Sequence, residues 1–208
     1  MRMQAPPKET PTHTSDPSAG WLRRLSLMAL GVVAVAVSAR VSATIPGVGV
    51  PQSAQTLAVL VVGAVLGARD GSLSLAAYLI VGGIGVPVFA EGGSGWAHLV
   101  GPTAGYLLGF VAAAAATGRM ADLDRLRRIG PALGVMICAH ALILALGWAR
   151  LSLTLGPAQA FWQGVTPFIL GGILKSVVAA LTVVAVAAVT QVVRSRAANA
   201  SDAFRPVE

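Results

Sequence analysis

Uninterrupted apolar runs constrain this chain more than any other feature of its sequence. Ala, Val, Leu and Gly fill several stretches of at least about 18 residues, the length at which an apolar helix crosses a bilayer. Backbone groups in hydrocarbon must be paired within the protein, so membrane spans are helices or closed barrels. The runs lack the alternating pattern of barrel strands. The sequence therefore predicts an all-α, polytopic membrane protein.

The composition excludes several classes of function. Charged residues make up 11% of the 208 residues, against about 25% in a soluble domain. The net charge of +7 falls mainly between the apolar runs, so we expect membrane lipid and no nucleic acid as a partner. The single cysteine, Cys138, and the missing CxxC pairs predict no metal site. Because HExxH, GxSxG and P-loop motifs are absent, we expect no enzyme activity, no catalytic residues and no cofactor.

The predicted organisation is a six-helix membrane domain, residues 21–194, between a disordered tail at 1–20 and a second tail at 195–208. Pro, Thr and Ser dominate the first tail. Two arginines before residues 25–37 also fit a secretion signal, but the spans that follow favour a first membrane helix. The predicted helices are residues 21–42, 52–68, 73–90, 97–117, 131–148 and 167–193.

Basic residues predict the orientation of these helices, because Lys and Arg gather on the cytoplasmic side of a membrane. With both termini in the cytoplasm, all 15 Lys and Arg residues lie inside except Arg40, Arg150 and Lys175. The opposite orientation inverts this distribution. We therefore expect cytoplasmic termini in a multi-pass protein of the cytoplasmic membrane, with residues 150–166 as a long outer connection.

Residues 85–110 form the most informative stretch, GVPVFAEGGSGWAHLVGPTAGYLLGF. Two apolar runs flank a Gly-rich hinge at residues 91–95, and this arrangement places one carboxylate near the bilayer surface, that of Glu91. Gly92 and Gly93 can present backbone N–H groups to a carboxylate or a urea carbonyl, although a plain flexible turn also fits. The stretch predicts a site for a small polar solute.

Lys175 is the strongest single candidate for contact with such a solute. A charge near mid-membrane costs roughly 2.5–3.5 kcal/mol on insertion scales, so we expect Lys175 to face a polar cavity. Glu91 could pair with Lys175, Arg40 or Arg150, or bind solute directly.

Further candidates offer hydroxyl, amide or aromatic groups. Thr103 and Tyr106 supply hydroxyls, Phe89 and Trp96 supply apolar walls, and Gln55 begins the second span. Each also fits an interfacial or structural role, and Tyr and Trp commonly anchor helices at the membrane surface. His98 is expected to cap a helix or meet water, and His140 to make a packing hydrogen bond.

Small residues at four-residue spacing predict close helix packing. A stripe on the first helix, formed by Ala34, Ser38 and Ser42, is expected to pack inside the protein or to dock a partner membrane protein. The two other stripes are Gly63, Gly67 and Gly71, and Gly101, Gly105 and Gly109.

PVFA, a Gly-rich loop and GPTAGYLLGF together closely resemble the BioY family, the biotin-binding membrane subunits of energy-coupling-factor vitamin importers. VPQSAQTLAVL at residues 50–60 and PFILGGILK at residues 167–175 extend the resemblance. It implies a six-helix substrate-binding subunit that captures biotin from outside without covalent chemistry. It also implies a transmembrane coupling protein and two ATPase subunits as partners, with Ala34 and Ser38 on the docking stripe.

One position departs from the family pattern. The residue three before the lysine is usually Asp in the family, and the two resemble a pair for the ureido ring of biotin. Here that residue is Gly172, so Lys175 loses its nearest counter-charge or Glu91 takes the role.

The alternatives to a biotin-binding subunit are a subunit for another vitamin, a stand-alone proton-coupled transporter and a membrane scaffold.

Overall fold

The computed structural model describes residues 17–43 and 52–203. Apart from two short antiparallel strands, β1 (Ser42–Ala43) and β2 (Gln52–Ser53), the described residues form helices and their connections. Residues 1–16 of the predicted tail at 1–20 lie outside the described residues, as does the whole Pro- and Gly-rich segment at 45–51. The helices are α1 (Pro17–Ala39), α2 (Gln55–Gly83), α3 (Trp96–Val100), α4 (Ala104–Asp122), α5 (Ile129–Leu155), α6 (Pro157–Gly164) and α7 (Ile169–Ala203).

Four helical stretches of the described chain are long and apolar enough to cross a membrane: Gly20–Ala39, Gln55–Gly83, Ile129–Leu155 and Pro157–Ala197. They confirm the prediction of an all-helical, multi-pass membrane protein. α4 is not among them. It is rich in Ala and Gly, which suits a helix that packs closely between others.

α2 is folded back on itself at Gly67. The φ angle of Gly67 is +82°, which glycine adopts without steric cost. A Cβ atom on Gly71 would lie 2.8 Å from the Cα atom of Gly63, whereas eight residues of straight helix span about 12 Å. α2 therefore consists of two antiparallel arms, residues 55–66 and 68–83. The predicted break between helices exists, and the N–H of Ala68 beyond it donates to Asp122 Oδ2 at 3.1 Å.

Other predicted boundaries differ from the structure. The predicted span at 97–117 is divided into α3 and α4, because Pro102 disfavours helical backbone in the residue before it. The connection predicted at 150–166 to be long and partly folded is mostly helical, since α5 continues to Leu155 and α6 begins directly after Gly156. The predicted tail from residue 195 continues as α7 to Ala203.

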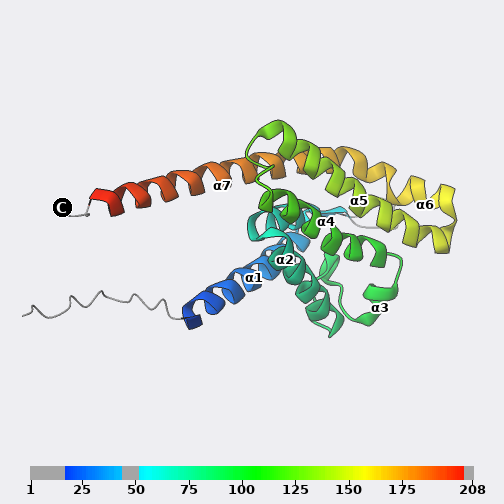
Figure 1. The fold of residues 1–208 in the computed structure, drawn as a ribbon. Helices are drawn as coiled ribbons and strands as arrows, with labels where there is room; N and C mark the ends of the chain where they lie inside the picture. The colour runs from blue at the N-terminus through cyan, green and yellow to red at the C-terminus, as the bar shows by residue number, and fades with distance from the viewer. Residues whose placement is uncertain (1–16, 44–51, 204–208) are drawn as a thin grey trace, which may run out of the picture.

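Glycines bring the central helices into close contact. α4 lies between α2 and α5, and α7 runs beside α5 before extending past the rest of the protein (Figure 1). A Cβ atom on Gly63 would lie 2.6 Å from Ala114 Cα, and one on Gly109 would lie 2.9 Å from Ile143 Cα. The prediction that these glycines serve helix packing is confirmed.

α1 packs on α2 through one face and leaves the other uncovered. Val35 and Ala39 are fully buried, and Arg24 forms an ion pair with Asp70 of α2. Ala34 is exposed, and Ser38 is half-buried with its hydroxyl donating to Val35 O at 2.7 Å. The prediction that the small-residue stripe packs inside the protein is therefore wrong at Ala34, because this side of α1 faces away from α2.

Candidate functional site

A cavity of about 400 Å³ lies among α2, α4, α5 and α7. Its size is within the usual range of small-molecule pockets, roughly 300–1,000 Å³. The segment 84–103 contributes part of its wall. The polar side chains that line the cavity are Ser53, Gln55, Thr56, Glu91, His98, Thr103, Tyr106, His140 and Lys175, and the large apolar ones are Phe89, Leu107, Phe110, Ile143, Leu144 and Phe168.

Lys175 reaches the cavity from α7 and is held by the end of β2. Its ammonium donates a hydrogen bond to the backbone carbonyl of Ser53 at 2.6 Å. The neighbouring Gln52 donates through its side chain to the carbonyl of Pro167. These two bonds place the lysine at the cavity wall, half-buried, where the sequence predicted a solute-facing charge.

Gln55 is buried in a polar chain that fixes the first turn of α2. Its side-chain amide donates to the Tyr78 hydroxyl, and its carbonyl accepts from the Ser53 hydroxyl at 2.8 Å. Tyr78 in turn donates to Val88 O at 2.9 Å. Sequence reasoning missed Tyr78, although a polar aromatic residue within an apolar run was an available signal.

Phe89 packs edge-on against Tyr78, with ring centroids 5.5 Å apart. Its ring is 2% exposed and occupies the space that a side chain at Gly82 would fill. Phe89 therefore joins the second arm of α2 to the cavity wall.

Tyr106 lines the cavity with its ring rather than with a free hydroxyl. The hydroxyl donates to the carbonyl of Gly164, at the end of α6, at 2.7 Å. The ring lies 6.2 Å from that of Phe168, measured between centroids. Tyr106 thus fastens α4 to α6 while its aromatic face borders the cavity.

The Gly-rich hinge is a compact turn. Glu91 has a φ angle of +57° and lines the cavity. Gly92 N–H donates to Phe89 O at 3.2 Å, and Gly93 N–H donates to Ala90 O at 3.0 Å. The backbone N–H groups predicted to face a solute therefore close the turn, and neither glycine lines the cavity.

Two arginines hold the segment 84–103 near its ends. Arg40 donates to the carbonyl of Pro87, and Arg150 donates to the carbonyl of Val100. Between these points His98 bonds to Ser94 O at 2.9 Å through Nδ1 and packs against Phe89. His98 lines the cavity, a position that the sequence did not indicate.

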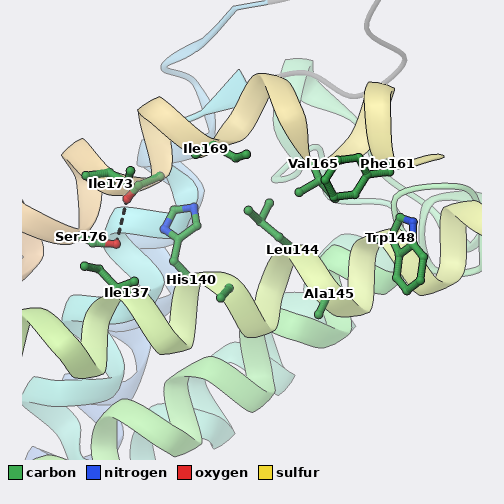
Figure 2. A pocket seen from close by; sticks show the side chains of 12 residues that line it. Ile137, His140, Leu144, Ala145, Trp148, Phe161, Val165, Ile169, Ile173 and Ser176 are labelled. Atoms are coloured by element: carbon green, nitrogen blue, oxygen red, sulfur yellow. Dashed lines mark hydrogen bonds between the residues drawn. The ribbon is translucent and has the colours of Figure 1, made fainter. Parts of the chain in front are cut away.

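Several candidates lie outside the cavity lining. Trp96 is 69% exposed, because α3 turns its first residue away from the core. Gly172 borders a separate apolar groove of about 640 Å³ between α5 and the α6–α7 side (Figure 2). Phe161 borders the same groove. His140 and Leu144 border both hollows.

The cavity combines an ammonium, an amide, hydroxyls and imidazoles with aromatic and aliphatic walls. This mixture suits a small solute that is polar at some positions and apolar at others. Among the described residues, no three His, Cys, Asp or Glu side chains are grouped in a way that could hold a metal ion.

The fold and the cavity define a helical, multi-pass membrane protein with a cavity of the size of a small-molecule pocket. The profile of the BioY family matches residues 8–192, and the chain belongs to this family.

Named relatives agree with this assignment. "Probable biotin transporter BioY" of Pyrococcus horikoshii is 36% identical over 161 residues, covering 76% of this chain and 93% of the relative. "Biotin transporter BioY" of Rhodobacter capsulatus is 36% identical over 173 residues, covering 76% and 90%. These relatives are named as transporters and not as enzymes, as the sequence predicted.

The fold is also that of a solved structure. A crystal structure of the S-component for biotin from an ECF-type ABC transporter superposes with a TM-score of 0.74 at 20% identity. The match covers 83% of this chain and 94% of that chain. The family predicted from residues 85–110 is confirmed.

Proposed function

We propose that the chain captures biotin at the outer face of the cytoplasmic membrane as the substrate-binding subunit of an energy-coupling-factor transporter. The observation that carries the proposal is the cavity itself, in which Lys175, Gln55 and Glu91 share a lining with a group of aromatic side chains. The names of the relatives supply the substrate. No covalent step is part of this function.

Biotin has the functional groups that such a cavity can accommodate. Its cyclic urea offers N–H donors and a carbonyl acceptor, its thioether ring is apolar, and its side chain ends in a carboxylate. Lys175 supplies a charged donor to an acceptor on the ligand. Phe89 and the ring of Tyr106 supply apolar contact with the thioether ring. Thr103 supplies a hydroxyl, and Glu91 contributes an acceptor from the hinge.

The proposed topology has six transmembrane segments, with both termini in the cytoplasm. They are α1, the two arms of α2, α4, α5 and α7. The hairpin at Gly67 supports this count, because it turns one apolar helix into two antiparallel segments. In this orientation Arg40 and Arg150, which hold segment 84–103, lie on the outer side with the cavity.

The proposed partners are a transmembrane coupling protein and two ATPase subunits, which supply the energy for transport. The exposed side of α1 supports docking through Ala34 and Ser38, since small side chains let helices from two membrane proteins approach closely. Lipid covers the remaining apolar surface.

The experiment that tests the function is a calorimetric titration of biotin into the detergent-purified protein, followed by competition with other vitamins. Biotin is expected to bind with one site per chain and to resist displacement by thiamine or pantothenate. Lys175→Met should weaken binding, whereas Ile169→Ala, in the apolar groove, should not. A folded wild-type protein that binds another vitamin and no biotin would contradict the substrate assignment.

Uptake measurements test the energy source. Labelled biotin should accumulate in cells only when the coupling protein and both ATPases are present together with this chain. Uptake that follows the pH gradient without any ATPase would instead identify a stand-alone secondary transporter.

A further inference from the structure

His140 is a buried polar residue to which the fold gives no structural hydrogen bond through Nδ1. The residue is 4% exposed, and Nδ1 has no hydrogen-bond partner among the described residues. A polar atom buried without a partner is costly. The expectation that His140 makes a packing hydrogen bond is therefore not met at this nitrogen, whose hydrogen-bonding capacity is left unused.

The position of His140 directs it towards the proposed binding site. Its side chain rises from α5 towards α7, with Leu144 one turn further along (Figure 2). These two side chains border both the cavity and the apolar groove, and so form part of the partition between the two hollows. The groove offers little polar surface, so a polar partner for the imidazole would come from the cavity side.

Gly172 on α7 makes room for this imidazole. A Cβ atom at Gly172 would lie 2.9 Å from His140 Nε2 and 3.0 Å from its Cδ2, closer than such atoms normally approach. Ser176, one turn further along α7, has its hydroxyl 2.8 Å from Gly172 O and 3.4 Å from Met136 O of α5, and so bridges the two helices at this point. The glycine therefore sets where the ring of His140 can lie.

The same wall of the cavity carries other polar groups. Lys175 is three residues after Gly172, roughly one turn of α7, and reaches the cavity. Thr56 also lines it, and its Oγ1 is buried without a hydrogen-bond partner among the described residues. A ligand that reaches His140 would thus meet an ammonium, a hydroxyl and an imidazole together.

We propose that His140 is a substrate-contacting residue that hydrogen-bonds the ureido ring of biotin, with Gly172 as the residue that positions its imidazole. This inference rests on the proposed function and deepens it. A neutral imidazole has one donor and one acceptor nitrogen. A cyclic urea offers both partners, whereas a carboxylate offers only acceptors. A neutral urea is also less costly to bury among apolar side chains than a charged carboxylate.

The first test is biotin titration of the full-length protein with three substitutions at one position. His140→Leu introduces an apolar side chain of similar bulk, His140→Asn places an amide near Nδ1, and His140→Gln places one near Nε2. We expect His140→Leu to lose affinity at least tenfold and one of the two amides to recover it to within about threefold. Equal losses in all three variants, or no loss in His140→Leu, overturn the inference.

The second test moves the imidazole without altering it. In Gly172→Ala the added Cβ displaces the ring, so biotin affinity should fall by several-fold. Gly134→Ala on α5, the helix that carries His140, is the control, since no neighbouring element lies within 4 Å of its Cβ position. The inference fails if the two variants bind biotin equally well while both remain folded at the temperature of the titration.

Biotin methyl ester distinguishes which end of the ligand His140 contacts. The ester keeps the urea and lacks the charged carboxylate, so the fold-loss caused by His140→Leu should be the same for biotin and for the ester. A loss seen only with biotin would overturn the ureido assignment. The proposed function itself fails if the wild-type protein binds neither compound. If the wild type and His140→Leu bind biotin equally well, the proposed function holds and the role of His140 is overturned.

Discussion

Lys175 Nζ on α7 lies 2.6 Å from the carbonyl oxygen of Ser53 on β2. This hydrogen bond joins two segments that are 122 residues apart in the chain. It closes the cavity wall between the start of α2 and the last membrane helix. The lysine therefore makes a structural bond to the backbone, and in the proposed function its charge also contacts the solute.

Replacing Lys175 by Met should weaken biotin binding by about tenfold or more. A hydrogen bond involving a charged group contributes about 1.5–3 kcal/mol, and Met keeps the apolar part of the side chain. Calorimetric titration measures the change. Arg196→Met, which removes an exposed charge from the same helix, is the control and should bind as the wild type does. Equal affinity in the two variants would show that Lys175 has no part in binding.

Tyr106→Phe should reduce stability more than it reduces affinity. The hydroxyl donates to Gly164 O, and removing it leaves a buried carbonyl without this donor, at a cost of about 1–3 kcal/mol. The ring that borders the cavity is retained, so affinity for biotin should fall by less than about threefold. Thermal unfolding and titration of the same preparation measure both quantities. A large loss of affinity at unchanged stability would mean that the hydroxyl contacts the ligand.

Gly63→Ala should destabilise the protein by about 1–3 kcal/mol, the usual cost of overpacking. The new Cβ would lie 2.6 Å from both the Cα and the carbonyl oxygen of Ala114, so α2 and α4 must separate. Gly134→Ala on α5 is the control, because no atom lies within 4 Å of its Cβ position. This change should stabilise the helix by up to about 1 kcal/mol. Unfolding temperatures that fall equally in both variants would contradict the packing described for Gly63.

Removing either arginine that holds segment 84–103 should speed the release of biotin. Arg40→Ala frees the carbonyl of Pro87, and Arg150→Ala frees that of Val100. Because the segment forms part of the cavity wall, dissociation should be several-fold faster in each variant and faster still in the double variant. Stopped-flow dissociation measures the rate.

Arg125→Ala is the control for this experiment, since it removes an exposed charge from the connection between α4 and α5. Its dissociation rate should equal that of the wild type. If the rate is unchanged in the double variant as well, segment 84–103 does not retain the ligand.

Much of the cavity lining could be predicted from the sequence, because the chemical character of a polar or charged residue restricts where it can lie in a membrane protein. A lysine in an apolar run has few stable positions other than a polar cavity, and Lys175 lies at one. Glu91, Phe89 and Thr103 line the same cavity because residues 85–110 bend back over it.

Other features depend on which way a helix turns, and composition does not determine this. Trp96 was expected at the cavity, but the short helix α3 exposes it and turns His98 inward instead. Tyr78 comes near Gln55 only because α2 reverses at Gly67. The meeting of His140 and Gly172 depends on the packing of α5 against α7, which no local pattern in either helix indicates.

The most direct test of the central claim is a crystal or cryo-electron-microscopy structure of the purified protein with biotin. Density for one biotin molecule is expected in the cavity lined by Phe89, Tyr106 and Lys175, with its ureido ring within hydrogen-bond distance of His140. Density in the groove between Trp148 and Ile169, with the cavity unfilled, would contradict it.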